Sequence, residues 1–376
     1  MHLSVPAPQP HTPAGAAAPY APKGQPSAPG GRRHATMLWA VPAESEERVM
    51  GRLRTRAVVT GTAALVTAMV GWMAPAAAAS RTFSAPVYAG DFPDPSVLVV
   101  NGTYWAYSTG SGGRDLQVMS SPDLHHWTGP GEALSGLPSW AIRGYTWAPG
   151  VMRIADRYVM YYAARDETLN MQCISVATSA SPGGPFVDES TAPLVCQTAD
   201  GGSIDPNPYL DPASGKLVLL WKSDDNAIGQ RSHIWAEQLA ADGLSFQSGS
   251  TPSLLLTQSA PWQSPTIEGP TVIRDGSRYY LFYGANSYNT ARSAIGYATS
   301  NSLFGPYTNR SVTSPWLGTT GNAQGPQGPM IFTDASGSTR MAFAAWYGTV
   351  GYQNGGVRSL WVGSLRFSGS GRPSLS

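Results

Sequence analysis

Three acidic residues occur in similar local sequence contexts, and their types and spacing could support acid–base chemistry. Asp94 and Asp205 each directly precede a proline, and Glu268 precedes a Gly-Pro pair. An ionised carboxylate can deprotonate a water, and a protonated one can donate to a leaving oxygen. Two such groups on either side of a sugar can hydrolyse its glycosidic bond. A third carboxylate near the donor raises the pKa of that donor, so the set offers a base, an acid and a tuner.

Each of these residues opens one copy of a repeated pattern. A polar residue or Trp is followed by Pro, an apolar strand, an Asn, Asp or Gly turn and an aromatic strand, which is typical of a β-hairpin. The copies span residues 94–109, 147–164, 205–223, 268–285 and 327–346. A third strand follows each hairpin, and the first four copies begin 53, 58 and 63 residues apart.

This spacing predicts an all-β fold, a five-bladed β-propeller with four short strands in each blade. A β-sandwich with accidental internal similarity is the alternative, which the number and spacing of the copies disfavour. In a propeller the first strand of each blade lines the central channel. We therefore expect the three acidic residues to occupy equivalent positions and to face one pocket.

The composition agrees with short strands and tight turns, because Gly (42) and Pro (32) are abundant while charged residues make up only 12%. The net charge of +1 offers no electrostatic attraction to nucleic acid or to an anionic membrane. A neutral carbohydrate is more compatible with this balance. We expect a carbohydrate substrate, no nucleic-acid partner and a monomer.

The N-terminal region is predicted to contain a targeting segment and not to be part of the folded domain. Residues 1–49 are rich in Pro, Ala and Gly and are expected to be disordered or a mis-called extension, with translation starting at Met50 or Met37. Residues 50–79 have a basic start, an apolar run and small residues at the end, as a secretory signal peptide does. A retained membrane anchor is the alternative, which the missing stop-transfer charges disfavour.

Secretion would leave residues 80–376 as the propeller domain, in an extracellular and oxidising environment. The chain has two cysteines, Cys173 and Cys196. In such an environment they can pair as a disulfide, which closes a loop of about 22 residues and contributes roughly 3 kcal/mol.

Over residues 85–367 the chain resembles glycoside hydrolase family 43, the arabinanase, α-L-arabinofuranosidase and β-xylosidase group. The motifs that carry the resemblance are DFPDPSV at 91–97, YTWAPGV at 145–151, SIDPNPYLD at 203–211 and IEGPTVI at 267–273. The resemblance implies that Asp94 is the general base, that Glu268 is the general acid, and that Asp205 tunes the acid and orients the substrate. It also implies inversion, with roughly 6.5–9.5 Å between base and acid. Asp91 is a rival base but more typical of a turn cap.

The chain departs from the family pattern in two blades. Gly150 replaces an Asp that often follows W-A-P in the second repeat. In the fifth, Gly328 stands where a G-P-G-H motif often carries a histidine that helps to hold a central calcium or water cluster. The amide of Gln327 could substitute, since calcium accepts oxygen ligands. We expect that no cofactor is required and that activity survives chelation.

Substrate contacts are predicted at aromatic residues near the blade starts, where rings can stack on a sugar. They are Trp147, Phe92, Tyr209 and Tyr288, and inter-blade packing is the alternative for each of them. Trp147 is the strongest candidate, because it occupies a repeat start where other copies carry carboxylates. Arg292 could contact substrate hydroxyls, or it could be a solvated loop cation.

Two other functions remain open. A fructan-cleaving propeller hydrolase would need a different ordered set of motifs, which is absent. A non-catalytic sugar-binding propeller would be expected to have lost a carboxylate, and none is missing. The sequence favours a secreted inverting glycoside hydrolase acting on arabinose- or xylose-containing plant polysaccharides or oligosaccharides. It does not determine the sugar, or whether cleavage is exo or endo.

Overall fold

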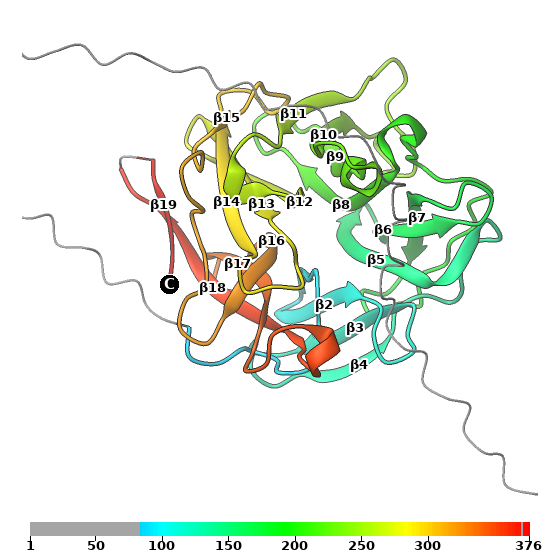
Figure 1. Ribbon diagram of the computed structural model, residues 1–376. Coiled ribbons are helices and arrows are strands. Elements are labelled where there is room, and N and C mark those ends of the chain that lie inside the picture. The colour runs from blue at the N-terminus through cyan, green and yellow to red at the C-terminus, as the bar shows by residue number, and fades with distance from the viewer. Residues whose placement is uncertain (1–82, 370) are drawn as a thin grey trace, which may run out of the picture. The chain divides into compact units, whose positions relative to one another are not determined.

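Five antiparallel sheets surround a central axis in the computed structural model, and the innermost strand of each sheet contacts the innermost strand of the next (Figure 1). The structure describes residues 83–369 and 371–376. The predicted all-β five-bladed β-propeller is thereby confirmed. The predicted N-terminal extension 1–49 and signal peptide 50–79 lie outside the described residues. In the described ranges no helix has the length and apolar character needed to span a bilayer.

Each blade is a meander in which consecutive strands are neighbours. Blade 1 contains β1 Ser96–Val100, β2 Thr103–Thr109, β3 Leu116–Ser121 and β4 Thr128–Glu132, and blade 2 contains β5 Ala141–Ile154, β6 Arg157–Asp166 and β7 Gln172–Ser179. Blade 3 contains β8 Ser203–Leu210, β9 Leu217–Ser223, β10 His233–Gln238 and β11 Ser253–Thr257. Blade 4 contains β12 Ile267–Asp275, β13 Arg278–Ala285, β14 Ala294–Ser300 and β15 Thr308–Asn309. Blade 5 contains β16 Gln324–Thr333, β17 Thr339–Trp346, β18 Arg358–Phe367 and β19 Pro373–Leu375.

The first hairpin shows why the repeats fold as they do. Asn101 and Gly102 form its two-residue turn, and both have left-handed φ angles, 49° and 80°. Asn and Gly tolerate that conformation best, and such a turn matches the twist of the flanking strands. Val100 then pairs with Thr103. This register turns alternate side chains toward the two neighbouring blades.

The hydrophobic core is divided into five clusters, one at each interface between blades. Tyr107 of blade 1 packs with Tyr162 of blade 2, for example, and Tyr161 of blade 2 packs with Trp221 of blade 3. Blades 3 and 4, and then blades 4 and 5, share two further clusters. The fifth cluster joins blade 5 to blade 1. Each blade is thus held by burial of apolar surface against its two neighbours.

The two ends of the propeller meet in blade 5. The segment before β1 runs beside β18, where the Val87 N–H donates to the Leu360 oxygen at 2.9 Å. The Leu360 N–H in turn donates to the Tyr88 oxygen at 3.0 Å. In Figure 1 the red strand β18 accordingly lies beside the first blade, in cyan. Backbone hydrogen bonds therefore close the ring.

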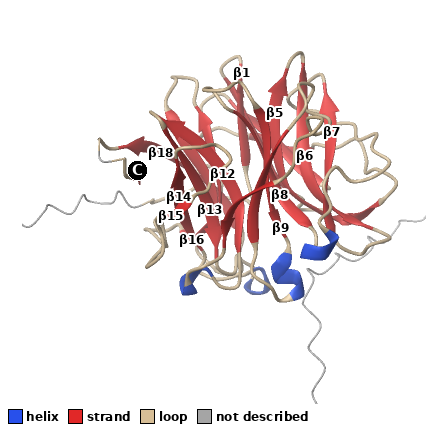
Figure 2. Ribbon diagram, turned by 90° about the horizontal axis from the view of Figure 1, so that it is seen from above, coloured by secondary structure: helices blue, strands red, loops and turns tan. Residues whose placement is uncertain are grey.

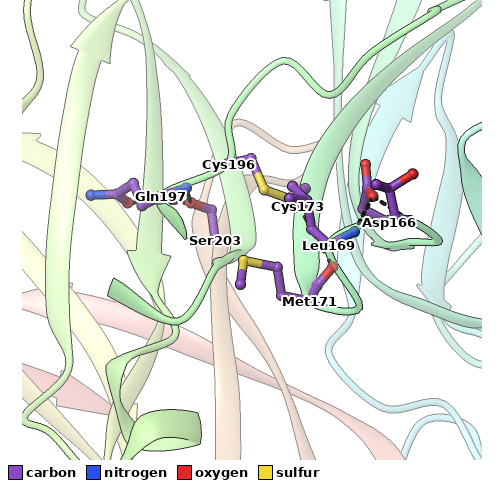
Figure 3. The surroundings of a disulfide bond; sticks show 8 residues. Asp166, Leu169, Met171, Cys173, Cys196, Gln197 and Ser203 are labelled. Atoms are coloured by element: carbon purple, nitrogen blue, oxygen red, sulfur yellow. Dashed lines mark hydrogen bonds between the residues drawn. A yellow bond between two sulfur atoms is a disulfide. The ribbon is translucent and has the colours of Figure 1, made fainter. Parts of the chain in front are cut away.

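Blade 2 has three strands instead of the four expected. The chain after β7 makes only single bridges to it, Thr178 with Val187 and Ile174 with Val195. Two prolines and two glycines at 182–185 connect β7 to this segment. Cys173 of β7 and Cys196 are joined as a disulfide with their Cα atoms 4.7 Å apart (Figure 3). The covalent link holds the outer segment against β7 where a fourth strand would be.

Four short 3-10 helices lie together at one end of the propeller (Figure 2). They are η1 Thr198–Asp200, η2 Asp225–Ile228, η3 Pro261–Gln263 and η4 Tyr352–Asn354. Three of them directly precede or follow the inner strand pairs β8–β9 and β12–β13, close to Asp205 and Glu268 in the chain. This end of the channel is therefore the one that carries the acidic residues.

Removing the disulfide by replacing both Cys173 and Cys196 with Ala should lower the free energy of unfolding by about 3 kcal/mol. The link restricts the unfolded chain across a separation of 23 residues, and that restriction is lost in the variant. Denaturant unfolding of the two proteins measures the difference. The wild type in a reducing agent should match the variant, and equal stability of oxidised wild type and variant would contradict the prediction.

Candidate active site

The three predicted carboxylates come from three different blades and meet at one end of the channel. Asp94 lies just before β1, Asp205 lies in β8 and Glu268 lies in β12. The charges of Glu268 and Asp94 both act on Asp205, so the three groups are close enough to influence one another's protonation. The backbone N–H of Gly269 donates to Asp205 Oδ2 at 2.8 Å and ties the third blade to the fourth at this point.

One backbone feature recurs in all five blades and shows which residues occupy equivalent positions. By this measure Glu268 is one residue out of step with Asp94 and Asp205. A residue with left-handed φ, between 46° and 58°, precedes a proline at Asp94, Ala148, Asp205, Gly269 and Gly328. In β5, β8, β12 and β16 the strand register shifts there, as at a bulge. Asp94 and Asp205 are therefore equivalent, but Glu268 comes one position earlier. Its equivalents are Trp147 and Gln327, which corrects the prediction that all three acids share one repeat position.

Asp94 is held from both sides. Thr109 Oγ1 donates to its Oδ2 at 2.7 Å, and the Arg358 Nη1 donates to its Oδ1 at 3.2 Å. The Asp94 side chain is 24% exposed, whereas the Arg358 side chain is only 7% exposed. The buried guanidinium and the partly exposed carboxylate form a charge-assisted hydrogen bond. This arrangement orients the Asp94 carboxylate and leaves part of it open to a water.

Arg358 is fixed in turn by a small network. Its Nε donates to the Tyr352 hydroxyl at 3.1 Å, and that hydroxyl donates to Asp91 Oδ1 at 3.0 Å. The guanidinium carbon lies 4.8 Å from the ring centre of Tyr288. Asp91 also accepts the Arg358 backbone N–H at 3.0 Å. Asp91, the rival candidate for the base, is thus occupied in holding the arginine that contacts Asp94.

Glu268 has an amide on one side and an ammonium on the other. Gln327 Nε2 donates to its Oε1, and the Gln327 Oε1 accepts from the Ser293 hydroxyl. Lys222 Nζ lies 3.9 Å from its Oε2. Burial raises the pKa of Glu268, and the positive charge of Lys222 partly opposes that rise. A carboxyl group with a raised pKa retains its proton, which is the state that a general acid needs.

The pKa of Asp205 is raised as well. Burial, followed by the negative charges of Glu268 and Asp94, raises the pKa of Asp205 from 3.8 to about 8. Like charges in a low-dielectric site disfavour one another's ionisation. Asp205 and Glu268 therefore retain a proton between them at neutral pH, while Asp94 has Arg358 as its counter-ion.

Some of the residues predicted to contact substrate are exposed, whereas others pack between the blades. Tyr288 is 46% exposed next to Arg358, and Trp147 is partly exposed on β5. Both rings remain available at the end of the channel that carries Asp94. Arg292 is exposed in the loop between β13 and β14.

Two predicted contacts are corrected by the structure. Phe92 is completely buried in the cluster between blades 5 and 1, where its ring packs edge-on against Tyr88. Tyr209 packs against the cluster between blades 3 and 4. Both rings therefore serve inter-blade packing, Phe92 from the segment before β1 and Tyr209 from β8.

Three side chains that lie directly beside the carboxylates were not predicted. Lys222 is a charged residue in the apolar strand LVLLWKS, and a lone charge in an otherwise buried strand is a signal that could have revealed it. Thr109 and Arg358 carry no such signal. Each lies at the end of a strand, far in sequence from the carboxylate that it contacts.

The residues of the fifth blade do not fit the calcium arrangement that the resemblance implies. Gly328 offers no side-chain ligand atom, and a Cβ at this position would lie 3.2 Å from the Asp94 Cα. The Gln327 amide oxygen already accepts the Ser293 hydroxyl. In the described part of the chain no three His, Cys, Asp or Glu side chains are grouped to hold a metal ion.

Known proteins are similar to this chain in sequence and in fold. The family model "Glycosyl hydrolases family 43" matches residues 83–371. A β-D-galactofuranosidase of Aspergillus niger is 30% identical over 55% of this chain and 61% of its own length. An extracellular exo-α-(1→5)-L-arabinofuranosidase of Cellvibrio japonicus is 26% identical over 51% of this chain and 58% of its own length.

Among solved structures, an endo-1,4-β-xylanase from Bacteroides thetaiotaomicron superposes with a TM-score of 0.65. It is 27% identical and aligned over 78% of this chain and 97% of its own. The chain spans about three fifths of the length of the two curated relatives. The family model, by contrast, extends over all five blades. The protein described here therefore belongs to family 43 of the glycosyl hydrolases.

Proposed function

We propose that this protein is a secreted, inverting glycoside hydrolase in which Asp94 is the general base, Glu268 is the general acid and Asp205 is the tuner of the acid. The observation that carries the proposal is the meeting of these three carboxylates at one end of the channel, from three separate blades. Propeller packing does not require acidic groups there, since the interfaces between blades are held by apolar clusters.

The surroundings of the carboxylates support opposite roles for base and acid. Asp94, held by Thr109 and Arg358, would accept a proton from water as that water attacks the anomeric carbon. Glu268, whose pKa is raised by burial, would donate its proton to the leaving oxygen. Water and acid acting on opposite faces of the sugar invert the anomeric centre.

Asp205 supports Glu268 because the protonation states of the two carboxyl groups influence each other. It lies on the blade next to Glu268, and the charge of Glu268 raises the pKa of Asp205. When substrate displaces water, a proton retained by the Asp205–Glu268 pair can reside on Glu268 for donation. The N–H of Gly269 keeps Asp205 in place while this occurs.

The substrate proposed is a pentose glycoside, α-L-arabinofuranosyl or β-D-xylosyl, of plant polysaccharides or oligosaccharides. Support comes from the names of the relatives, one an exo-α-(1→5)-L-arabinofuranosidase and one an endo-1,4-β-xylanase. The exposed ring of Tyr288 and the partly exposed ring of Trp147 offer apolar faces on which a sugar can stack. The extracellular name of the Cellvibrio relative and the leader-like residues 50–79 support secretion.

We expect the wild type to release 4-nitrophenol from an α-L-arabinofuranoside or a β-D-xyloside, or dye from arabinan or xylan. A β-D-galactofuranoside belongs in the same panel because of the Aspergillus relative. Proton NMR of the first-formed sugar should show the inverted anomer. A protein that binds these sugars but hydrolyses none would be a carbohydrate-binding propeller instead.

Glu268→Gln should lower kcat on an unactivated oligosaccharide at least about a hundredfold, because general acid catalysis is lost. With a dinitrophenyl glycoside the loss should be much smaller, since that leaving group needs no proton. Glu237→Gln is the matched control, because Glu237 is buried in β10 outside the channel end. Equal losses in the two variants, or equal losses on both substrates, would contradict the acid role of Glu268.

Asp205→Asn should stabilise the protein, and the gain should grow as the pH rises. The folded pKa of about 8 lies above the unfolded value of 3.8, so between these values the folded state binds more protons than the unfolded state. Wild-type stability therefore falls as pH rises through that window, whereas Asn does not titrate. Thermal unfolding from pH 4 to pH 9 measures this effect, with about 2–4 °C expected for each kcal/mol.

Asp211→Asn provides the opposite control for the stability measurement. Asp211 is a buried turn carboxylate that accepts hydrogen bonds from Ser214 and Tyr279. Although burial opposes it, these bonds lower its pKa. This substitution should destabilise the protein at neutral pH. A pH-independent difference for Asp205→Asn would contradict the raised pKa of Asp205.

Treatment with EDTA should leave the hydrolytic rate within about twofold of the untreated value. The fifth blade lacks the expected histidine, and the Gln327 amide is already engaged with Glu268 and Ser293. The check is a rate measurement after extensive chelation, with and without added calcium. A large loss that calcium restores would overturn this expectation.

A further inference from the structure

A fully buried lysine lies immediately behind Glu268, and fold stability does not account for it. Lys222 is 0% exposed and lies within the apolar strand β9. Removing an ammonium from water costs several kcal/mol unless it is paired closely. A leucine or methionine at this position would fill the same space without that cost. The retained charge therefore points to a role in the site.

The position of the ammonium is set by two carboxylates. Lys222 Nζ lies 2.7 Å from Asp224 Oδ1 and 3.9 Å from Glu268 Oε2. Asp224 is anchored through its backbone, because its N–H donates to the Gly202 oxygen at 2.9 Å. Asp224 also directly precedes η2. The ammonium is consequently held between a carboxylate with a structural position and the carboxyl proposed as the acid.

The charges that face Glu268 come from several blades. Lys222 and Asp224 belong to blade 3, as does Asp205, while Asp94 and Arg358 approach from the junction of blades 1 and 5. Among these, the two cations favour the ionised form of Glu268 and the carboxylates oppose it. Burial lowers the pKa of the Lys222 ammonium, but Asp224, Glu268 and Asp205 outweigh burial and raise it overall. Lys222 therefore remains charged throughout the working pH range.

We propose that Lys222 and Asp224 are positioning residues for Glu268 and act on its charge in opposite directions. Lys222 stabilises the negative charge that Glu268 acquires when it donates its proton. Asp224 holds the Lys222 ammonium in place and partly offsets its positive charge. The inference rests on the proposed function, since it assigns a partner to the acid. Without Lys222, the buried carboxyl between Asp205 and Asp94 would hold its proton too tightly to donate it readily. With Lys222 but without Asp224, Glu268 would lose its proton at too low a pH.

Two single substitutions with opposite expected signs test the pair. Lys222→Met removes the positive charge, so the basic limb of the kcat/KM profile should move upward by about one pH unit or more, as expected for a buried charge at this distance. Asp224→Asn removes a negative charge, and the basic limb should move downward by a smaller amount. Lys222→Arg, which keeps the charge, should keep the limb near its wild-type position.

A purely structural pair would behave differently. It would lower the melting temperature in both variants without moving their limbs in opposite directions. Lys222→Met leaves Asp224 unpaired, so the double variant Lys222→Met/Asp224→Asn provides a neutral pair in which folding is less affected. Its limb should move upward, but less than in Lys222→Met. Circular dichroism establishes that each variant is folded.

The protonation of Glu268 can also be read without any substrate. Carbon-13 labelling of the glutamate side-chain carboxyls gives a resonance for Glu268 that is identified by its absence in Glu268→Gln. Its titration midpoint should rise in Lys222→Met and fall in Asp224→Asn. Midpoints that stay unchanged in folded variants would overturn the inference even if the enzyme is active. An inactive wild type whose midpoints still move would instead overturn the proposed function alone.

Discussion

Closure of the ring between the first and last blades is the constraint on which the site depends. The segment before β1 pairs with β18 through Tyr88 and Leu360, and the same junction buries one of the five apolar clusters. Because of this pairing, Arg358 from the end of the chain lies beside Asp94 from its first blade. If the ring opened, Asp94 would lose its counter-ion and its position together. Fold and chemistry therefore share one set of backbone hydrogen bonds.

The site concentrates charge in a way that opposes stability. Asp94, Asp205, Glu268 and Asp224 lie near one another, and among the described residues Arg358 and Lys222 offset their charges. Burial without full compensation raises the pKa of Asp205 and of Glu268, which is a cost to folding at neutral pH. Catalytic sites commonly retain such strain because it holds a proton where a reaction needs one. The apolar interfaces between the blades supply the stability that offsets it.

The five blades show how one backbone device serves different purposes. Each blade has a left-handed residue before proline, within or just before its inner strand, and this residue turns the chain at the channel end. Two blades place an aspartate on that residue, whereas one places its glutamate a position earlier. Glu268 thus points to neighbours different from those of Asp94. Its equivalent in the fifth blade, Gln327, has become its hydrogen-bond partner. Repetition of the backbone with variation of two adjacent side chains is enough to assemble unlike groups around one axis.

Much of this protein could be predicted from its sequence. Turn residues such as Asn101 and Gly102, the alternation within strands and the recurring Pro motifs are local features, so the five blades and the three acids were evident without coordinates. The paired cysteines were expected only if the chain is exported, and they are joined in the structure. The roles of residues 50–79 remain a prediction, since those residues lie outside the described part of the chain.

The tertiary structure decided which residues contact the acidic side chains and where the aromatic rings lie. Phe92 and Tyr209 stand near acidic motifs in the chain, yet both pack between blades. Arg358 and Lys222 are distant from Asp94 and Glu268 in sequence, yet they set the charge around them. A sequence pattern records which way a side chain alternates along its own strand. Contacts across the axis arise only when five blades pack and the ring closes, so local patterns cannot determine them.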